Sequence, residues 1–172
     1  MNAGQFLRPA IAGLCLLGLG GCDDGQNAGS NKFRNDYTEA RTALETGHFD
    51  RANRIYARML DQAGPLEPRI RLEYAHSLLR SGAYAEAAQQ AQSLAQSQTG
   101  TARSAALAVL GVAQQELGLV ALGDGDRTAA RHYLTQAQGA IAQVLDADPG
   151  LDPLGALAGR QASIQVQLAT LG

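Results

Sequence analysis

The chain of 172 residues contains no tryptophan, only 5% aromatic residues, and two cysteines that both lie near its N-terminus. Because Cys15 and Cys22 are the only ones, residues 23–172 can form neither a disulfide framework nor a cysteine-based metal site. Proline and β-branched residues are also scarce whereas alanine is abundant, a composition that favours closely packed helices over a sheet. The net charge of −2 shows no basic excess of the kind that marks nucleic-acid binding.

Residue constellations that carry chemistry are missing as well. His48, His76 and His132 lie on separate elements, with no acid or thiol at ligand spacing. The stretch 123–126 (Gly-Asp-Gly-Asp) is similar to a fragment of a calcium loop, but the twelfth position counted from Asp124 is Thr135 and not an acid. It therefore predicts a tight turn. No Gly-x-Ser-x-Gly motif occurs either. The sequence predicts a protein that is not an enzyme and that needs no metal and no cofactor.

A helix–turn–helix pattern is the dominant feature of the sequence. In Leu72–Leu94, apolar and small residues recur at helical spacing on both sides of Gly82. The pattern recurs thirty-five residues earlier, so that each position of the later stretch has an equivalent. The later positions are Leu72, Ala75, Leu78, Leu79, Gly82, Tyr84, Ala87, Ala91 and Leu94. Their equivalents, in the same order, are Tyr37, Ala40, Ala43, Leu44, Gly47, Phe49, Ala52, Tyr56 and Met59. A period near 34 residues is typical of a helical-repeat solenoid. The alternative is an alanine-rich helical bundle in which the spacing arises by chance.

The second half of the chain predicts a longer helix pair and a closing helix. Residues 102–122 and 127–147 predict two longer helices, the second with a sustained apolar stripe, although Arg127 stands where the earlier repeats have an aromatic residue. Asp50 is the predicted N-cap of the second helix of the chain. Asp152-Pro153 is the expected opening of a last helix, which would cap the stack. The predicted domains are a repeat region at 34–150 and a capping helix at 151–172.

Residues from about 34 to 147 resemble tetratricopeptide repeats. The resemblance implies an all-α, short helical-repeat solenoid with an elongated third helix pair, whose first helices line a groove for a peptide. The residues that it implies for this groove are Arg34, Tyr37, Arg41, Arg69, Leu72, His76, Arg80 and Gln115. Arginine suits carboxylate recognition because its planar fork donates paired hydrogen bonds. The expected ligand is an acidic segment or a C-terminal carboxylate of a protein partner; alternatively, these arginines are solvated helix faces.

The first residues predict a targeting signal. Arg8 precedes an apolar core at 10–19, which is about half the roughly twenty residues of a membrane-spanning helix. Leu19-Gly20-Gly21-Cys22 then resembles the lipobox of bacterial lipoproteins. The resemblance implies removal of residues 1–21 and lipidation of Cys22, and Asp23 favours the inner membrane. An ordinary secretory signal is the alternative. Residues 22–33 predict a flexible tether, because they are polar and rich in Gly, Asn and Ser.

Together these features predict a periplasmic lipoprotein, held at the membrane by its N-terminal lipid, that acts as an interaction scaffold. Its construction resembles the pilotin and Tad-type pilus assembly families, and more distantly the assembly factors for outer-membrane barrels, which have more repeats. The function this implies is the assembly of a cell-envelope machine such as a pilus or a secretion system. The alternative is a structural accessory subunit of a cell-wall or exopolysaccharide biosynthesis complex that binds through its convex face. Neither interpretation involves nucleic acid.

Overall fold

The computed structural model describes residues 24–172, which form α-helices joined by short turns, with no strand in this part of the chain. This confirms the predicted all-α, repeat-like fold. The predicted signal peptide, Cys22 and Asp23 lie outside the described residues. The helices are α1 (Asp24–Glu45), α2 (Phe49–Leu60), α3 (Glu67–Arg80), α4 (Tyr84–Ser97), α5 (Gly100–Gly123), α6 (Arg127–Ala147) and α7 (Ala156–Leu171), with short 3₁₀ turns η1 (Gly64–Leu66) and η2 (Pro149–Leu151).

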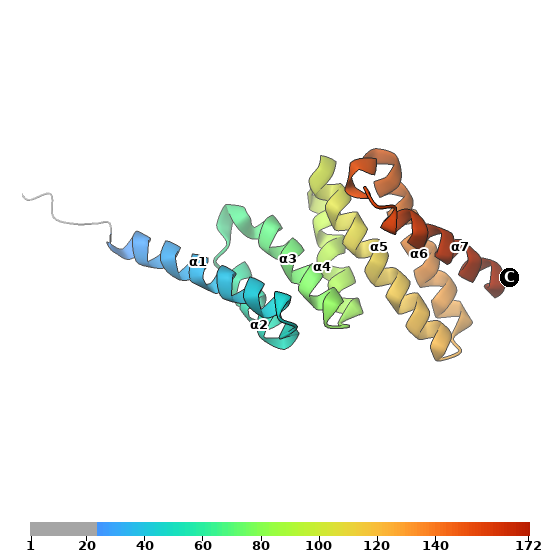
Figure 1. The fold of residues 1–172 in the computed structure, drawn as a ribbon, viewed down its shortest axis with the longest axis horizontal. Helices are drawn as coiled ribbons and strands as arrows, with labels where there is room; N and C mark the ends of the chain where they lie inside the picture. The colour runs from blue at the N-terminus through green and yellow to red at the C-terminus, as the bar shows by residue number, and fades with distance from the viewer. Residues whose placement is uncertain (1–23) are drawn as a thin grey trace, which may run out of the picture.

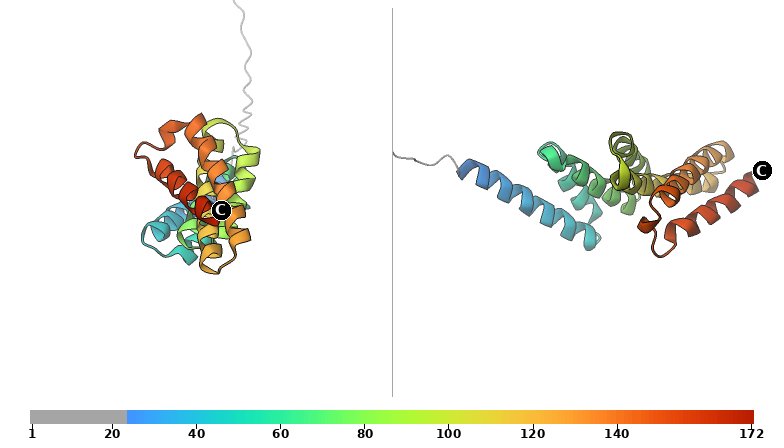
Figure 2. Two further views of the ribbon diagram at one scale, coloured as in Figure 1. Left: turned by 90° about the vertical axis from the view of Figure 1, so that its right-hand side faces the viewer. Right: turned by 90° about the horizontal axis from the view of Figure 1, so that it is seen from above.

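The helices pack as a row of antiparallel pairs (Figures 1 and 2). α1 packs on α2, α3 on α4 and α5 on α6, each pair also contacts the next, and α7 lies against α6. The α5–α6 pair is the elongated third pair that the sequence predicts, and the bounds of α6 are those predicted. The apolar residues are buried both within the pairs and between neighbouring pairs.

Equivalent glycines end the first helix of each pair. Gly47, Gly82 and Gly125 have φ of 80°, 82° and 79°, a left-handed conformation that costs glycine least. The residue after each glycine donates its N–H to a carbonyl in the last turn of the helix, at 2.8, 3.0 and 2.9 Å: His48 to Ala43, Ala83 to Leu78 and Asp126 to Ala121. The third pair therefore keeps the repeat register at its turn, although its helices are longer.

Small residues allow the helices to approach one another closely. Ala40, Ala52, Ala75, Ala87 and Ala130 are fully buried. Gly118 takes the place of Ala40 and Ala75 in the third pair, and a Cβ built there would lie 2.7 Å from Leu134 Cγ. Such a distance is too short for a real contact, so the crossing of α5 and α6 at this point requires glycine.

Some predicted helix starts differ from the structure. α1 extends back to Asp24, so residues 24–33 are helical where the sequence predicts a flexible tether. The N-cap of α2 is His48, and Asp50 instead lies in the first turn, where its charge complements the helix dipole. α7 begins at Ala156, after Gly155 with φ of 72°, so Asp152-Pro153 precedes the helix and does not open it.

The apolar helix α5 is the central element of the C-terminal half. Its length and composition alone would let it cross a membrane, but 56% of its most apolar window is buried inside the structure. The burial arises from α4 and α6, which pack on either side of it. This is the environment of a core helix in a packed helical domain.

Candidate functional site: a groove between α1 and α3

A hollow of about 180 Å³ separates the N-terminal parts of α1 and α3. α1 contributes Phe33, Arg34 and Tyr37, which share one face because the first two precede Tyr37 by about one helical turn. η1 and α3 contribute Leu66, Arg69 and Ile70. We call this site, defined by these residues, the α1/α3 groove. A wider hollow continues it past Gly29 and Gln62 and shares Phe33, Arg34 and Leu66 with it.

The floor of the α1/α3 groove is apolar. Ile70 is 1% exposed and belongs to the cluster of buried residues between α1, α2 and α3, and Phe33 packs against the same cluster. Leu66 is 49% exposed, although it lies beside these apolar residues. An apolar side chain of a partner could therefore cover Leu66 and gain roughly 25 cal/mol for each Å² of apolar surface removed from water.

Arg34 and Arg69 form the polar rim of the groove. The Arg69 guanidinium lies 5.6 Å from the centre of the Tyr37 ring, and its Nη2 donates to the Tyr37 hydroxyl at 3.3 Å. The Arg34 side chain donates to Asn31 Oδ1. Neither guanidinium has an ion pair with a carboxylate among residues 29–172. The groove thus offers positive charge that the described residues leave uncompensated.

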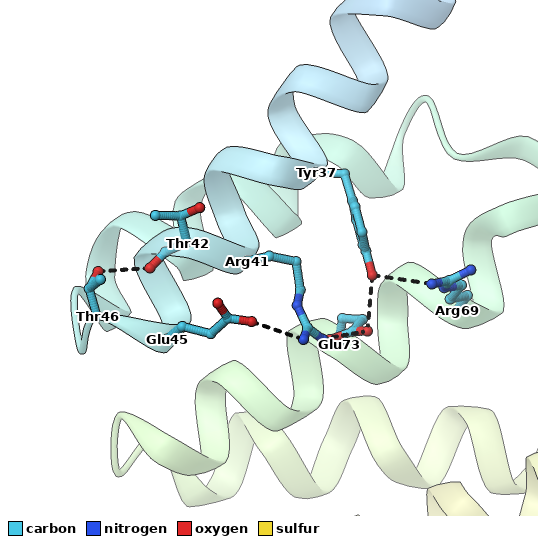
Figure 3. A network of polar contacts seen from close by, with 7 residues as sticks. All are labelled: Tyr37, Arg41, Thr42, Glu45, Thr46, Arg69 and Glu73. Carbon is cyan, nitrogen blue, oxygen red and sulfur yellow. Dashed lines mark hydrogen bonds and ion pairs between the residues drawn. The ribbon is translucent and has the colours of Figure 1, made fainter.

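Arg41 lies further along α1 in a different environment (Figure 3). Its Nη1 donates to Glu73 Oε1 and Oε2 at 3.2 and 3.0 Å, and its Nη2 donates to Glu45 Oε1 at 3.1 Å. The attraction of Glu73 raises the pKa of Arg41 above its usual value. Glu73 also accepts a hydrogen bond of 3.2 Å from the Tyr37 hydroxyl. Arg41 therefore fastens α1 to α3, and it is not a free cation of the groove.

Residues 37–102, which include most of this site, match the model of the tetratricopeptide repeat family. The matched residues, which we call the tetratricopeptide-repeat segment, are 66 of the 172 residues of the chain and are similar to this family. No curated protein and no solved structure matches the chain. Repeats of this family typically serve as protein-interaction scaffolds, which suggests such a role for the tetratricopeptide-repeat segment.

The remaining residues predicted for the groove are distributed along the tetratricopeptide repeats and beyond them. Leu72 lines a neighbouring hollow of about 340 Å³, which shares Leu66 and Arg69 with the α1/α3 groove. His76 is exposed one turn further along α3. Arg80, at the end of α3, places its guanidinium 5.2 Å from the centre of the Phe49 ring. Arg34, Tyr37 and Arg69 are therefore the predicted residues that line the α1/α3 groove itself.

Gln115 is a correction to the predicted site. It is 3% exposed, and its Oε1 accepts a hydrogen bond of 2.7 Å from Arg160 Nη1 of α7. The same guanidinium nitrogen donates to Glu116 at 3.1 Å. α7 thus covers this part of α5, and Gln115 cannot line an open groove.

The sequence prediction missed the apolar part of the site and one carboxylate. Phe33 precedes Tyr37 by one helical turn, so extending the helical period back through the polar stretch would have included it. Leu66 and Ile70 flank Glu67, where η1 ends and α3 begins. Glu73 lies thirty-two residues from Arg41, and no local pattern links the two.

No group of three or more His, Cys, Asp or Glu side chains that could hold a metal ion occurs in the described part of the chain. The stretch Gly123–Asp126, which is similar to a calcium-loop fragment, forms the turn between α5 and α6. There Asp126 caps α6 by accepting the N–H of Ala129 at 2.9 Å.

Proposed function

We propose that the tetratricopeptide-repeat segment holds a segment of a partner protein in the α1/α3 groove, and that this segment carries a carboxylate next to an apolar side chain. The observation that carries the proposal is an open apolar hollow whose rim holds Arg34 and Arg69 without carboxylate partners. A guanidinium donates paired hydrogen bonds to a carboxylate. The exposed Leu66 offers the apolar contact beside it.

The setting that we propose for this binding is the bacterial cell envelope. The support comes from the sequence, in which Leu19-Gly20-Gly21-Cys22 follows a short apolar core. Lipidation at Cys22 would hold the protein at the periplasmic side of a membrane, and Asp23 favours the inner membrane. Several acyl chains on one residue anchor a protein stably, whereas one chain binds only marginally. The groove would then meet its partner at the membrane surface, as a scaffold in the assembly of a machine such as a pilus or secretion system.

The groove is tested by charge reversal with a matched control. Crosslinking in cells followed by mass spectrometry would compare the wild type with a variant carrying both Arg34→Glu and Arg69→Glu. The control is Arg58→Glu, because Arg58 is exposed on α2 and does not line this groove. We expect the double variant to lose a partner that the wild type and the control retain. An identical set of partners for all three proteins would refute the groove as the binding site.

The anchor is tested by Cys22→Ser. We expect the wild type to incorporate a clickable palmitate analogue and to sediment with membranes, and the variant to do neither. Unchanged labelling of the variant would refute lipidation at Cys22. If the variant loses the label but stays with the membranes, the lipid is not what anchors the protein.

A further inference from the structure

The loop between α6 and α7 presents a leucine that folding leaves almost entirely in water. Leu154 is 93% exposed, which makes it the most exposed large apolar side chain among the residues that the structure describes, and Leu151 of the same loop is exposed as well. We call residues 146–154, from the last turn of α6 to Leu154, the acidic loop. Because folding removes little of the Leu154 surface from water, this apolar surface remains available to another molecule.

Two carboxylates precede this leucine without a compensating cation. Asp146 is exposed in the last turn of α6, and Asp148 follows at the end of the helix. Neither carboxylate has an ion pair within residues 29–172, and Arg103, which reaches the same part of α6, donates to the Gln143 amide instead. A negative charge at a helix C-terminus is unfavourable, because the helix dipole is negative there. A cation supplied by another molecule would relieve this repulsion.

Hydrogen bonds and prolines hold the acidic loop in one shape. The Asp152 N–H donates to the Pro149 carbonyl, and the Gly155 N–H donates to the Asp152 carbonyl, both at 3.1 Å. The second bond closes the turn that contains Leu154. Pro149 and Pro153 fix φ at their positions. Little conformational freedom would therefore be lost if the loop bound to another molecule.

The acidic loop is the chemical complement of the α1/α3 groove. The groove holds the exposed Leu66 beside Arg34 and Arg69, whose positive charges no carboxylate of residues 29–172 compensates. The acidic loop holds an exposed leucine beside two carboxylates that lack a cation. It is thus a segment of the kind that the proposed function requires, with a carboxylate close to an apolar side chain.

The acidic loop cannot enter the groove of its own chain. The groove is built by α1, η1 and α3, whereas the loop follows α6. Figure 1 shows α1 and α7 at opposite ends of the row, and α4 and α5 pack between α3 and α6. A second copy of the chain can bring its own loop to the groove, because no such separation applies between molecules.

We propose that the α1/α3 groove binds the acidic loop of a second copy of this chain, with Leu154 packed on Leu66 and the two carboxylates of the loop facing the two arginines of the rim. The inference rests on the proposed function, since it names the partner of the same groove. Groove and loop are different surfaces, so the contact is heterologous. Two copies then either exchange loops reciprocally or leave one groove and one loop free for further copies.

Co-purification of two differently tagged full-length copies from the same cells tests this contact, with each substitution present in both copies. Arg34→Glu/Arg69→Glu and Asp146→Arg/Asp148→Arg each place like charges opposite one another. We expect either variant to lower the co-purified fraction at least fivefold. The chain with all four substitutions exchanges the two signs, so it should recover most of the wild-type fraction.

Matched control variants separate the contact from a general effect of charge or hydrophobicity. Glu86→Arg/Asp124→Arg reverses two exposed carboxylates outside the acidic loop and should leave the co-purified fraction unchanged. Leu154→Gln should lower this fraction, whereas Val166→Gln, at an exposed position of α7, should not. Circular dichroism would verify folding, and arginine in the last turn of α6 suits the helix dipole, so the loop variant should keep its fold.

The loop variants also distinguish this inference from the proposed function, because they leave the groove unchanged. The inference is overturned if wild-type copies do not co-purify, or if Asp146→Arg/Asp148→Arg or Leu154→Gln co-purifies as the wild type does. The proposed function stands in that case, provided that Arg34→Glu/Arg69→Glu still loses a different protein in the crosslinking comparison. If that groove variant loses neither a second copy nor another protein, both proposals fail.

Discussion

Glycine has opposite roles at two positions of the third helix pair. At Gly118 a Cβ would lie 2.7 and 2.9 Å from the Cγ and Cδ2 atoms of Leu134, which is fully buried. At Gly139 the same Cβ would meet nothing within 4 Å. The two positions lie on facing helices of one pair, so a comparison between them separates packing from helix propensity.

Alanine substitutions at these positions should therefore have different effects on stability. Gly139→Ala should raise the free energy of unfolding by about 0.5–1 kcal/mol, because alanine loses less backbone entropy. Gly118→Ala gains the same propensity but overpacks against Leu134, which costs about 1–3 kcal/mol. Urea denaturation should thus find Gly118→Ala less stable than Gly139→Ala by about 1–3 kcal/mol. Equal free energies of unfolding for the two variants would mean that α5 and α6 move apart to accommodate the added methyl group at no cost in free energy.

The arginines of the predicted site illustrate what can be read from a sequence at this scale. The resemblance to tetratricopeptide repeats implied that Arg34, Tyr37 and Arg69 line one groove, and the structure brings these residues together. The same resemblance treated Arg41 as an equivalent cation, yet Arg41 forms an ion pair with Glu73. The difference depends on which side chains of α1 and α3 meet, and this is decided by the packing of the two helices and not by spacing within either.

At the level of secondary structure, α7 is held at both ends by polar contacts. Before the helix, Asp152 Oδ1 and Oδ2 accept the backbone N–H groups of Leu157 and Ala158 at 2.9 and 3.0 Å. At the other end, Arg127 Nη2 donates to the carbonyls of Thr170 and Leu171 at 3.2 and 3.1 Å. Arg127 occupies the place of the aromatic residues Phe49 and Tyr84 of the earlier pairs, and these contacts explain the exception.

The cap at Asp152 makes the stability of α7 depend on pH. Hydrogen bonds from the Leu157 and Ala158 backbone lower the pKa of Asp152 below its usual value of about 3.9. A carboxyl whose pKa is lowered on folding stabilises the folded state above its unfolded pKa, and this contribution disappears as the pH falls through its folded pKa.

We expect Asp152→Asn to lower the thermal midpoint at pH 7, since the charged acceptor at the N-terminus of α7 is lost. The difference in thermal midpoint between the variant and the wild type should become smaller as the pH is lowered from about 5 to below 3, because the wild-type carboxyl then becomes protonated. Thermal denaturation across this range measures the effect, and Asp146→Asn on α6 is the control. A difference in thermal midpoint that stays constant with pH would contradict the role of the Asp152 carboxylate as a cap of α7.

The helices that the sequence predicted best are those whose limits are set by burial. α6 was predicted with its observed bounds, because its apolar stripe and its flanking Asp126 and Pro149 define both ends. The start of α1 was missed because residues 24–32 are polar and show no apolar period. The position of α7 against α5, which buries Gln115, depends on tertiary packing that no repeat pattern encodes.

On the scale of the whole molecule, the buried residues fall into separate clusters along the row. One joins α1 and α2 to Ile70 of α3, and a larger one extends from α4 to α7 together with Ala75. A smaller cluster of Leu78, Ala87 and Ala113 lies between them. In a stack of repeats each unit contacts mainly its neighbours, so stability is approximately a sum of local terms. We therefore expect the part of the chain that holds the α1/α3 groove to open without unfolding the rest.

Met59→Ala should reveal this division. Met59 is 2% exposed in the first cluster, and truncation of such a buried side chain costs about 2–5 kcal/mol. Hydrogen–deuterium exchange should become faster in α1 and α2, with α5 and α6 almost unchanged. The matched variant Leu134→Ala, which truncates a fully buried residue of the larger cluster, should accelerate exchange in α5 and α6 instead. A uniform acceleration in both variants would show that the row unfolds as one cooperative unit, and the α1/α3 groove could then not open separately from α5 and α6.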